Sequence, residues 1–230
     1  MKHIGIILDG NRRFAKRLLQ KPWDGHQKGA ENVENVIQWA RELNIKELTL
    51  YAFSEQNFQR AKEEVEFLMK IFSKTFQRLI DDRLEKLNKN GIRINFIGRI
   101  SKFPGEVHDK MQQLMQLTKD NKELTVNFAM AYGGREEIID TAVKIAKEVK
   151  EGNLSPENIT EEVFAKHLYL NSDPDFIIRT GGDRRTSNFL VWQSNYSEWF
   201  FLEKTWPEFT KEDLMQCIEE FEERERRFGK

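Results

Sequence analysis

Two segments of this 230-residue sequence place glycine and arginine beside a carboxylate, a combination suited to binding phosphate groups. The first is Asp9-Gly10-Asn11-Arg12-Arg13, which follows a short apolar run and precedes a helix-like stretch. Glycine lets the backbone approach a ligand closely, a helix N-terminus presents free N–H groups, and arginine donates paired hydrogen bonds to phosphate oxygens. Because Asp9 would repel a bare phosphate, we expect a bridging Mg²⁺, which binds carboxylate and phosphate oxygens together. The segment predicts a diphosphate site, with a turn flanked by solvated arginines as an equal alternative.

The second segment, residues 179–188, reads RTGGDRRTSN. Its three arginines, two glycines and three hydroxyl side chains suit a second anion site, because glycine frees the backbone and arginine binds phosphate in two-pronged fashion. The order of a nucleotide-binding P-loop is missing. A surface loop with solvated charges is the alternative. Two anion sites at one edge of a sheet would suit a reaction between two phosphorylated substrates.

The third segment, residues 53–60, mixes small polar, amide, aromatic and arginine side chains. Such a mixture suits the place where an apolar substrate carries its phosphate head. The segment also reads as a cap for the helix that follows, with Ser54 or Asn57 at the N-cap position. Both interpretations can hold together.

The elements that position these segments alternate between short apolar runs and amphipathic stretches. Composition typical of strands occupies residues 4–8, 47–53, 92–97, 124–130, 175–178 and 189–192. Helical patterns occupy residues 12–19, 30–43, 62–90, 105–118, 135–150, 161–168 and 211–227. The alternation predicts an α/β fold in one domain, residues 1–230, with a central, mostly parallel six-stranded sheet flanked by helices. In such sheets ligands bind beyond the carboxyl ends of the strands, where the three polar segments stand.

The composition excludes several classes of protein. Lys and Arg total 37 against 38 Asp and Glu, so the formal net charge of −1 gives no global field that would attract nucleic acid. Residues 1–30 nevertheless hold seven lysines and arginines against two aspartates, so anion binding would be local. The single cysteine excludes an intramolecular disulfide and a multi-cysteine metal site. Because no apolar run approaches the ~20 residues of a membrane span, we expect a cytoplasmic protein.

Together with further blocks along the chain, these segments resemble the cis-prenyltransferases, the family of undecaprenyl diphosphate synthase. The matching blocks cover essentially the whole chain, at residues 3–16, 25–26, 49–54, 57–58, 127, 132–135, 179–182, 187–190, 192–198 and 224–229. Residues 183–188 are more similar to archaeal members. The resemblance implies a single α/β domain that forms a homodimer. It also implies a Mg²⁺-dependent elongase that adds isopentenyl diphosphate to farnesyl or geranylgeranyl diphosphate. The product would be a Z-polyprenyl diphosphate, the precursor of a lipid glycosyl carrier that is delivered to the membrane, where the protein could lie peripherally.

The resemblance also assigns roles to individual residues. Asp9 and Asn57 would be catalytic, with Asp9 binding Mg²⁺ and Asn57 taking part in proton removal. Glu198 would be the other Mg²⁺ carboxylate. The side of the allylic substrate would be formed by Gly10, Asn11, Arg12, Arg13, Phe14, His26 and Phe58. The adjoining loop would contribute Ser54, Glu55, Gln56 and Arg60, and isopentenyl diphosphate would be held in the segment of Arg179, Arg185, Thr186 and Ser187.

Several questions stay open from sequence. The apolar face of residues 62–90 is either ordinary core or the wall of a tunnel for the growing chain, in which case Phe72, Phe76 and Leu79 would help set product length. The chain is either the elongase or a non-catalytic subunit of a heteromeric relative, and its intact Asp-Gly-Asn block favours the elongase. Pro22 stands where members commonly have an arginine, so either Lys21 beside it substitutes or one phosphate contact is missing. Residues 227–229 resemble a tail motif that reaches a partner subunit's active site.

Overall fold

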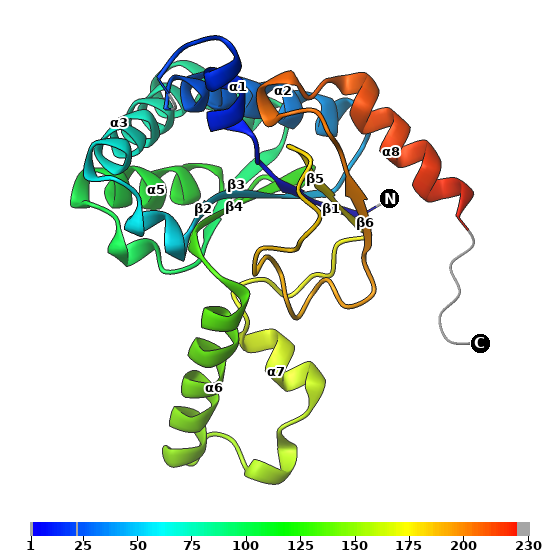
Figure 1. Cartoon of the computed structure of the whole chain (residues 1–230). Helices are drawn as coiled ribbons and strands as arrows, with labels where there is room; N and C mark the ends of the chain where they lie inside the picture. Colours follow the sequence, from blue (N-terminus) through cyan, green and yellow to red (C-terminus); the bar gives the residue numbers. More distant parts are fainter. Residues whose placement is uncertain (1, 22, 225–230) are drawn as a thin grey trace.

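The computed structural model of the protein describes residues 2–21 and 23–224, which contain one six-stranded sheet (Figure 1). The strand order is β3-β4-β2-β1-β5-β6, and every neighbouring pair is parallel. The strands are β1 (His3–Ile7), β2 (Glu47–Ser54), β3 (Ile92–Ile97), β4 (Leu124–Tyr132), β5 (Phe176–Arg179) and β6 (Glu198–Phe201). The predicted α/β class and the first five predicted strands are therefore confirmed.

The prediction of a strand at residues 189–192 is wrong, because the sixth strand is β6. Phe189 and Leu190 are fully buried, as their apolar character suggested. However, Leu190 has a φ of +44°, in the left-handed region, which a paired strand does not use. The ring of Phe189 instead stacks on that of Tyr51, with centroids 4.7 Å apart. A short apolar run reports burial and does not by itself distinguish a strand from a packed loop.

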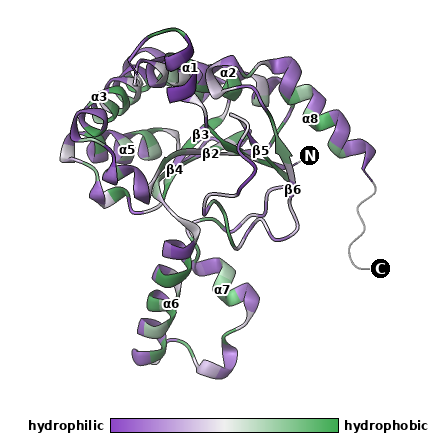
Figure 2. Ribbon diagram, viewed as in Figure 1, coloured by the Kyte–Doolittle hydropathy of each residue, from purple (hydrophilic) through white to green (hydrophobic). Residues whose placement is uncertain are grey.

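The helices lie close to the predicted stretches. They are α1 (Asn11–Arg17), α2 (Asp24–Glu42), α3 (Lys62–Arg78), α4 (Leu84–Lys89), α5 (Gly105–Thr118), α6 (Gly134–Lys150), α7 (Glu161–His167) and α8 (Lys211–Glu223). The predicted long helix is continuous from α3 to α4 through a π-helical segment, Leu79–Arg83, and Gly91 follows it with a φ of +63°. Figure 2 shows hydrophobic and hydrophilic residues alternating along the helices, as expected for helices that bury one side.

The larger core lies on the face of the sheet covered by α2, α3, α5 and α8. A smaller cluster around Tyr51, Tyr132 and Phe189 packs on the opposite face. The pair α6 and α7 projects away from the body of the molecule (Figure 1). None of the helices in the described part of the chain combines the length and the hydropathy that a transmembrane segment needs.

The register of the sheet determines where the polar segments meet. In β1, Ile7 pairs with Tyr51 of β2 on one side and with Arg179 of β5 on the other. The residues that follow these three positions leave the sheet at the same edge, since all three strands are parallel. The segments that begin at Asp9, Ser54 and Thr180 therefore converge.

Candidate active site

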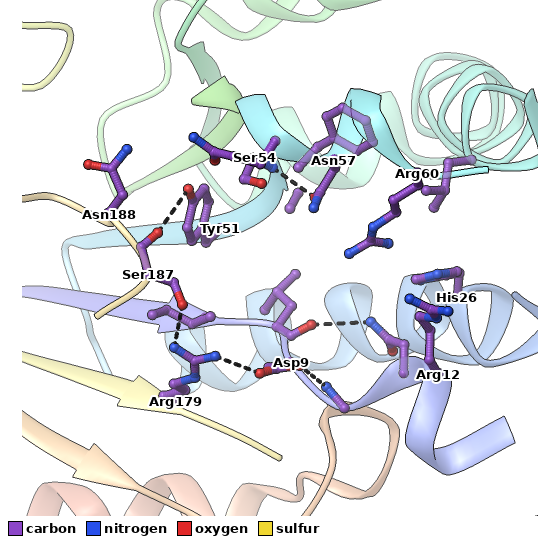
Figure 3. A pocket seen from close by; sticks show the side chains of 18 of the residues that line it. Asp9, Arg12, His26, Tyr51, Ser54, Asn57, Arg60, Arg179, Ser187 and Asn188 are labelled. Carbon is purple, nitrogen blue, oxygen red and sulfur yellow. Dashed lines mark hydrogen bonds and ion pairs between the residues drawn. The ribbon is translucent and has the colours of Figure 1, made fainter. Parts of the chain in front are cut away.

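A cavity of about 780 Å³ opens at this edge of the sheet (Figure 3). It brings together most of the residues that the sequence predicted. Those that line it are Asp9, Gly10, Asn11, Arg12, Arg13, His26, Ser54, Gln56, Asn57, Arg60, Arg179, Arg185 and Ser187. Three segments far apart in the sequence thus form one site, as the parallel register requires.

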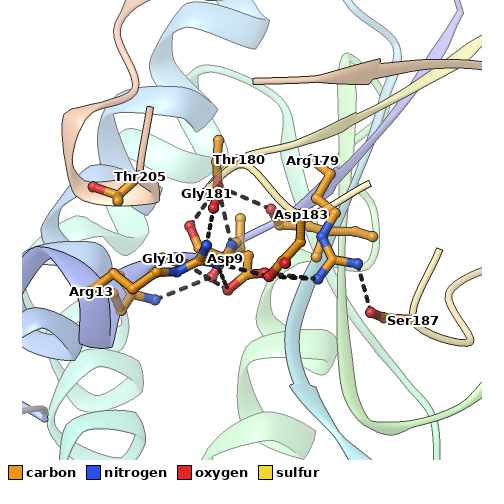
Figure 4. A network of polar contacts seen from close by, with 12 residues as sticks. Asp9, Gly10, Arg13, Arg179, Thr180, Gly181, Asp183, Ser187 and Thr205 are labelled. Carbon is orange, nitrogen blue, oxygen red and sulfur yellow. Dashed lines mark hydrogen bonds and ion pairs between the residues drawn. The ribbon is translucent and has the colours of Figure 1, made fainter. Parts of the chain in front are cut away.

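The turn after β1 is fixed by backbone and hydroxyl contacts (Figure 4). The Thr180 hydroxyl accepts a hydrogen bond from Asp9 N at 3.1 Å and donates one to Asp9 O at 2.8 Å. Gly10 has a φ of +102°, and a Cβ atom there would lie 2.7 Å from Cβ of Thr205. Glycine is therefore required at this position both by its backbone conformation and by the close approach of Thr205.

Arg179 connects this turn to the loop that follows β5. Its guanidinium is only 3% exposed and donates to Oδ2 of Asp9 at 2.8 Å and to Oγ of Ser187 at 2.6 Å. Burial raises the pKa of Asp9, but the hydrogen bond and charge of Arg179 and the charge of Arg13 outweigh burial and hold that pKa below its ordinary value. Asp9 is therefore ionised at neutral pH.

A second carboxylate, that of Asp183, lies among three arginines (Figure 4). Its Oδ2 is 3.1 Å from Nη2 of Arg13, 3.0 Å from Nη2 of Arg185 and 3.8 Å from Nη2 of Arg179. Arg13 also donates to the carbonyl oxygen of Gly181. The three guanidinium groups thus converge on one carboxylate, and all three arginines also line this end of the cavity.

The other end of the cavity holds His26, Arg12 and Arg60 (Figure 3). All three face Glu64, whose side chain is 5% exposed. Its Oε1 is 3.0 Å from Nη1 of Arg60, 3.2 Å from Nε2 of His26 and 3.9 Å from Nε of Arg12. Sequence reasoning missed Glu64. The four-residue spacing of Arg60 and Glu64 across the start of a helix is the signal that could have identified it.

The imidazole of His26 is neutral in this surrounding. Burial lowers its pKa, and the charges of Arg60 and Arg12 lower it further, whereas the hydrogen bond and charge of Glu64 act in the opposite direction. The net effect holds the pKa of His26 below its ordinary value. A neutral ring donates one hydrogen bond without adding charge to the cavity.

Ser54 and Asn57 form a capping box, but the prediction that one of them caps the long helix is wrong, because the N-cap residue of α3 is Ala61. The box begins a 3₁₀ helix, Glu55–Gln59, that precedes α3. Oδ1 of Asn57 accepts a hydrogen bond from Ser54 N at 2.9 Å. The amide group of Asn57 therefore has its Nδ2 atom left to donate into the cavity, where the side chain stands opposite Asp9 (Figure 3).

Four predicted binding residues do not line the cavity. Glu55 pairs with Arg99 at 3.5 Å and with Lys102. Phe58 packs against Phe53, with ring centroids 4.8 Å apart. Phe14 is half-buried on α1 and Thr186 is exposed on its loop.

Two further predictions concern the loop after α1 and the tail. Lys21 does not line the cavity either, and its ammonium lies 5.8 Å from the ring centroid of Trp23. Pro22 and residues 227–229 lie outside the described residues, so the predictions that concern them stay predictions.

Glu198 lies at the opposite end of the sheet from Asp9. It pairs with Phe176, which pairs with Ile4, so Glu198 is level with the start of β1. Three strand steps separate that level from Ile7, the last residue of β1, which is about 10 Å, and the turn that holds Asp9 lies beyond it. Its carboxylate accepts a hydrogen bond from Arg224 at 2.8 Å. A single chain therefore does not bring the two predicted Mg²⁺ carboxylates together, and no group of three or more His, Cys, Asp or Glu that could hold a metal occurs within residues 2–21 and 23–224.

A smaller apolar cavity of about 80 Å³ lies between α2, α3 and the sheet and adjoins the polar one. Leu8, Asn11, His26, Ala52 and Leu68 line both cavities. Phe72, Phe76 and Leu79 line the apolar one, as the tunnel interpretation requires. Aromatic rings surround it, with Phe76 and Phe96 5.0 Å apart and Phe96 and Phe128 5.4 Å apart between centroids.

Sequence reasoning also missed the residues that support Ser187. The hydroxyl of Tyr51 lies 3.1 Å from Tyr132 O and 3.3 Å from Ser187 O. Asn188 donates from Nδ2 to Glu136 at 2.8 Å. Ser187 and Asn188 have φ values of +51° and +62°, so these contacts stabilise an unfavourable backbone conformation. Asn188 could have been identified, since asparagine tolerates left-handed backbone. Nothing in the sequence around Tyr51 indicated such a contact.

Known proteins match this chain over its full length. The family described as "Putative undecaprenyl diphosphate synthase" matches residues 7–229. The chain belongs to the cis-prenyltransferase family. It is therefore a prenyltransferase, as its sequence predicted. The chain is 46% identical over 231 residues to the tritrans,polycis-undecaprenyl-diphosphate synthase (geranylgeranyl-diphosphate specific) of Thermococcus kodakarensis, and the match covers 100% of this chain and 87% of that protein.

Two further relatives extend the match. The isoprenyl transferase of Thermotoga maritima is 45% identical over 230 residues, which cover 99% of this chain and 96% of that protein. The crystal structure of lavandulyl diphosphate synthase from Lavandula x intermedia in complex with dimethylallyl diphosphate is similar in fold, with a TM-score of 0.91 and 37% identity. That match covers 99% of this chain and 98% of the other. The fold of this prenyltransferase is thus the fold of its family.

Proposed function

We propose that this prenyltransferase is a Mg²⁺-dependent elongase that condenses isopentenyl diphosphate with an allylic diphosphate to make a Z-polyprenyl diphosphate, the precursor of a lipid glycosyl carrier. One observation carries the proposal. The Asp9 carboxylate stands in a polar cavity with arginines at both ends, and that cavity adjoins an apolar one. Geranylgeranyl diphosphate is the primer we favour over farnesyl diphosphate, because the archaeal relative is named as specific for it.

The two ends of the polar cavity suit the two diphosphates. The end with Arg12, His26 and Arg60 adjoins the apolar cavity, since His26 lines both. We assign the allylic substrate to this end, with its hydrocarbon tail directed toward Phe72 and Phe76. The end with Arg179, Arg185 and Ser187 would hold isopentenyl diphosphate.

The reaction breaks the bond between the allylic carbon and its diphosphate and forms a carbon–carbon bond from the double bond of isopentenyl diphosphate, which then loses one proton. Arg12 and Arg60 would stabilise the charge that grows on the leaving diphosphate. Holding both substrates in one cavity supplies proximity. Asn57 would donate from Nδ2 to a diphosphate oxygen and so orient the oxygen that accepts the proton, because its own Oδ1 is already bonded to Ser54 N.

Asp9 is the residue that fits Mg²⁺. Its side chain is 29% exposed toward the cavity and is held ionised by Arg179 and Arg13. Mg²⁺ is commonly bound by one or two carboxylates together with substrate phosphates, so one aspartate between two diphosphates is sufficient. When bound, Mg²⁺ neutralises charge on the leaving diphosphate. Glu198 has no part in this site within one chain.

We propose further that the protein is a homodimer joined through α6. Ile139 is 60% exposed and Val143 is 49% exposed, one helical turn apart on the same side of α6. Val191, 42% exposed, lies against Gly134 at the start of that helix. A second copy that packs its own α6 against this helix would bury these three apolar side chains on both protomers. Sedimentation should give a dimer for the natural sequence and a monomer for Ile139→Asp, and a monomeric natural protein would contradict the assignment.

The experiment that tests the elongase is incubation of the purified protein, without any other subunit, with Mg²⁺, labelled isopentenyl diphosphate and C10, C15 or C20 allylic primers. The products are then sized. We expect incorporation with the C20 primer and its loss in Asp9→Ala, whereas Asp81→Ala, an exposed carboxylate on the π-helical segment, should retain it. Incorporation only after a second subunit is added would favour the non-catalytic alternative instead.

A further inference from the structure

The loop between α1 and α2 exposes an apolar tip. Leu19 is 97% exposed and its neighbour Leu18 is 54% exposed. Leu19 also has a φ of +56°, a backbone conformation that leucine rarely adopts. In Figure 1 the loop lies on the outside of the layer formed by α1 and α2, on the opposite side of the molecule from the projecting α6 and α7. Two adjacent leucines held in water at a protruding turn indicate a surface that something apolar covers.

Basic side chains surround this tip. Because Arg12 and Arg13 line the polar cavity, the basic residues near the tip are Lys16, Arg17 and Lys21. Arg17 is paired with Glu208 at 2.5 Å, whereas Lys16 and Lys21 are exposed and form no ion pair with a residue in the described part of the chain. Trp23 is half-buried at the other end of the loop, and the ammonium group of Lys21 lies over its ring. The tip therefore combines exposed leucines, a tryptophan and two lysines without an ion pair in the described residues, beside one carboxylate, that of Asp24, which accepts a hydrogen bond from Lys21 N at 3.1 Å.

We propose that the described part of this loop, residues 16–21 and Trp23, docks on an anionic membrane surface, with Leu18 and Leu19 inserted among the lipid headgroups. Lysine and arginine around leucine and tryptophan form the composition that binds at the boundary between headgroups and acyl chains. The positive charge complements anionic lipid. A protein partner is less suited, because the two leucines protrude at a turn and line no groove that a partner could fill.

The docking would serve the proposed function, on which this part of the inference rests. The helix that follows the tip, α2, lines the apolar cavity with Val33 and Ile37. Docking would thus hold the helix layer around the apolar cavity against lipid, which is where a long polyprenyl product has to go.

Vesicle flotation tests the docking with the full chain. We expect the protein to float with phosphatidylcholine vesicles that contain phosphatidylglycerol, and less at high salt or with phosphatidylcholine alone. Leu18→Ser combined with Leu19→Ser should weaken binding about tenfold or more, because burial of a leucine is lost. Lys16→Glu should weaken it at least about fivefold. Leu117→Ser on α5, an apolar residue that is 40% exposed elsewhere, is the matched control and should bind as the natural protein does.

Fluorescence adds a second readout, which reports directly on the position of the loop at the membrane. Brominated lipid should quench Trp23, so Trp23→Phe should lose part of the quenching while it still floats. Absence of vesicle binding by the natural protein, or equal binding by the double leucine variant, would overturn the docking. Leu18 and Leu19 line neither cavity, so the double variant should keep its rate with the C20 primer in detergent. Prenyl transfer without vesicle binding would reject the docking alone, and vesicle binding without prenyl transfer would reject the proposed function alone.

Discussion

The polar and apolar cavities lie side by side but are held together by different interactions. In the polar cavity, Asp9 and Arg179 are fixed by directional hydrogen bonds to neighbouring loops. In the apolar cavity, Phe76 and its aromatic neighbours are fixed only by packing. A polar contact is lost when its atoms move by a fraction of an ångström, whereas packed rings can be exchanged for others of similar volume.

This difference suggests a division of roles. The polar cavity, at about 780 Å³, has room for two diphosphates, and its residues would determine whether and how fast the reaction occurs. The apolar cavity, at about 80 Å³, has to widen before a long chain can enter. Its side chains would therefore determine how far the chain grows and have little influence on the chemistry. The predictions below test that division, from the largest expected effect to the smallest.

The largest effect is expected in the polar cavity, at Asp9. Asp9→Asn keeps the shape of the side chain but removes the charge that would bind Mg²⁺. The initial rate of isopentenyl incorporation should fall at least about 10³-fold, the size of effect seen when charge stabilisation at a reacting group is lost. Asp81→Asn is the control and should leave the rate unchanged. A fall of less than tenfold in Asp9→Asn would contradict the assigned role.

A smaller effect is expected at Glu64, which orients basic groups and touches no substrate in our assignment. Glu64→Gln removes the charge that holds Arg60, His26 and Arg12 in place. We expect the KM for the allylic primer to rise by roughly ten- to hundredfold, the range for loss of a buried charge contact. The KM for isopentenyl diphosphate should hardly change, because that substrate is assigned to the other end of the cavity. Equal changes in both KM values would indicate general destabilisation instead of positioning.

In the apolar cavity the expected change is in product length. Phe76→Ala should lengthen the products, because it enlarges the space between α3 and the sheet, and it should lower the stability by about 3–5 kcal/mol. Phe76→Leu removes less volume and keeps the fold testable if the alanine variant unfolds. Phe164→Ala is the control for an aromatic contact that is lost away from both cavities. Phe164 lies on α7, and its ring stacks on that of Trp192 with centroids 4.6 Å apart. An unchanged distribution of product lengths in both Phe76 variants would show that the apolar face of α3 is ordinary core and does not set product length.

The smallest effect concerns pH. The pKa of His26 is lowered chiefly by burial, and so is the pKa of His3. At these two histidines the unfolded chain binds more protons than the folded chain once the pH falls below about 6.5, so their contribution to stability is fully present above that value and decreases below it. The pKa of His167 is raised by its hydrogen bonds to Val163 and Glu148 and acts in the opposite direction, but that side chain is far less buried than the other two. Thermal unfolding should show a lower midpoint at pH 5.5 than at pH 7.5, and His26→Gln should reduce the difference. A midpoint that rises on acidification would contradict these pKa directions.

The same comparison explains how much the sequence could predict. The Asp9 turn and the Arg179 loop were identifiable, because phosphate chemistry uses few residue types and parallel strands bring their carboxyl ends to one edge. Tyr51 was not, since a residue that acts by supporting another has no chemical pattern of its own, and Glu64 offered only its four-residue spacing from Arg60. The position of Glu198 within one chain was not predictable for a similar reason, and its Mg²⁺ role stays a prediction. Its role came from the resemblance alone, and only the register of β5 and β6 shows that it lies at the far end of the sheet.

The apolar cavity was predicted only in part. The spacing of Phe72, Phe76 and Leu79 indicated a buried face, but the spacing of apolar residues does not tell a cavity wall from filled core. The buried run at residues 189–192 was read as a strand for the same reason. Burial is encoded in composition, whereas the shape of the space depends on how distant segments pack.

One measurement tests the division of roles most directly. Arg179→Lys and Phe76→Leu are compared with the natural protein in the same reaction with the C20 primer, and both the initial rate and the product length are recorded. We expect Arg179→Lys to lower the rate at least about tenfold with unchanged product length, because lysine cannot form the paired contacts of arginine. Phe76→Leu should lengthen the products at nearly the natural rate. A shift in length with Arg179→Lys, or a loss of rate without a shift in length with Phe76→Leu, would contradict the account.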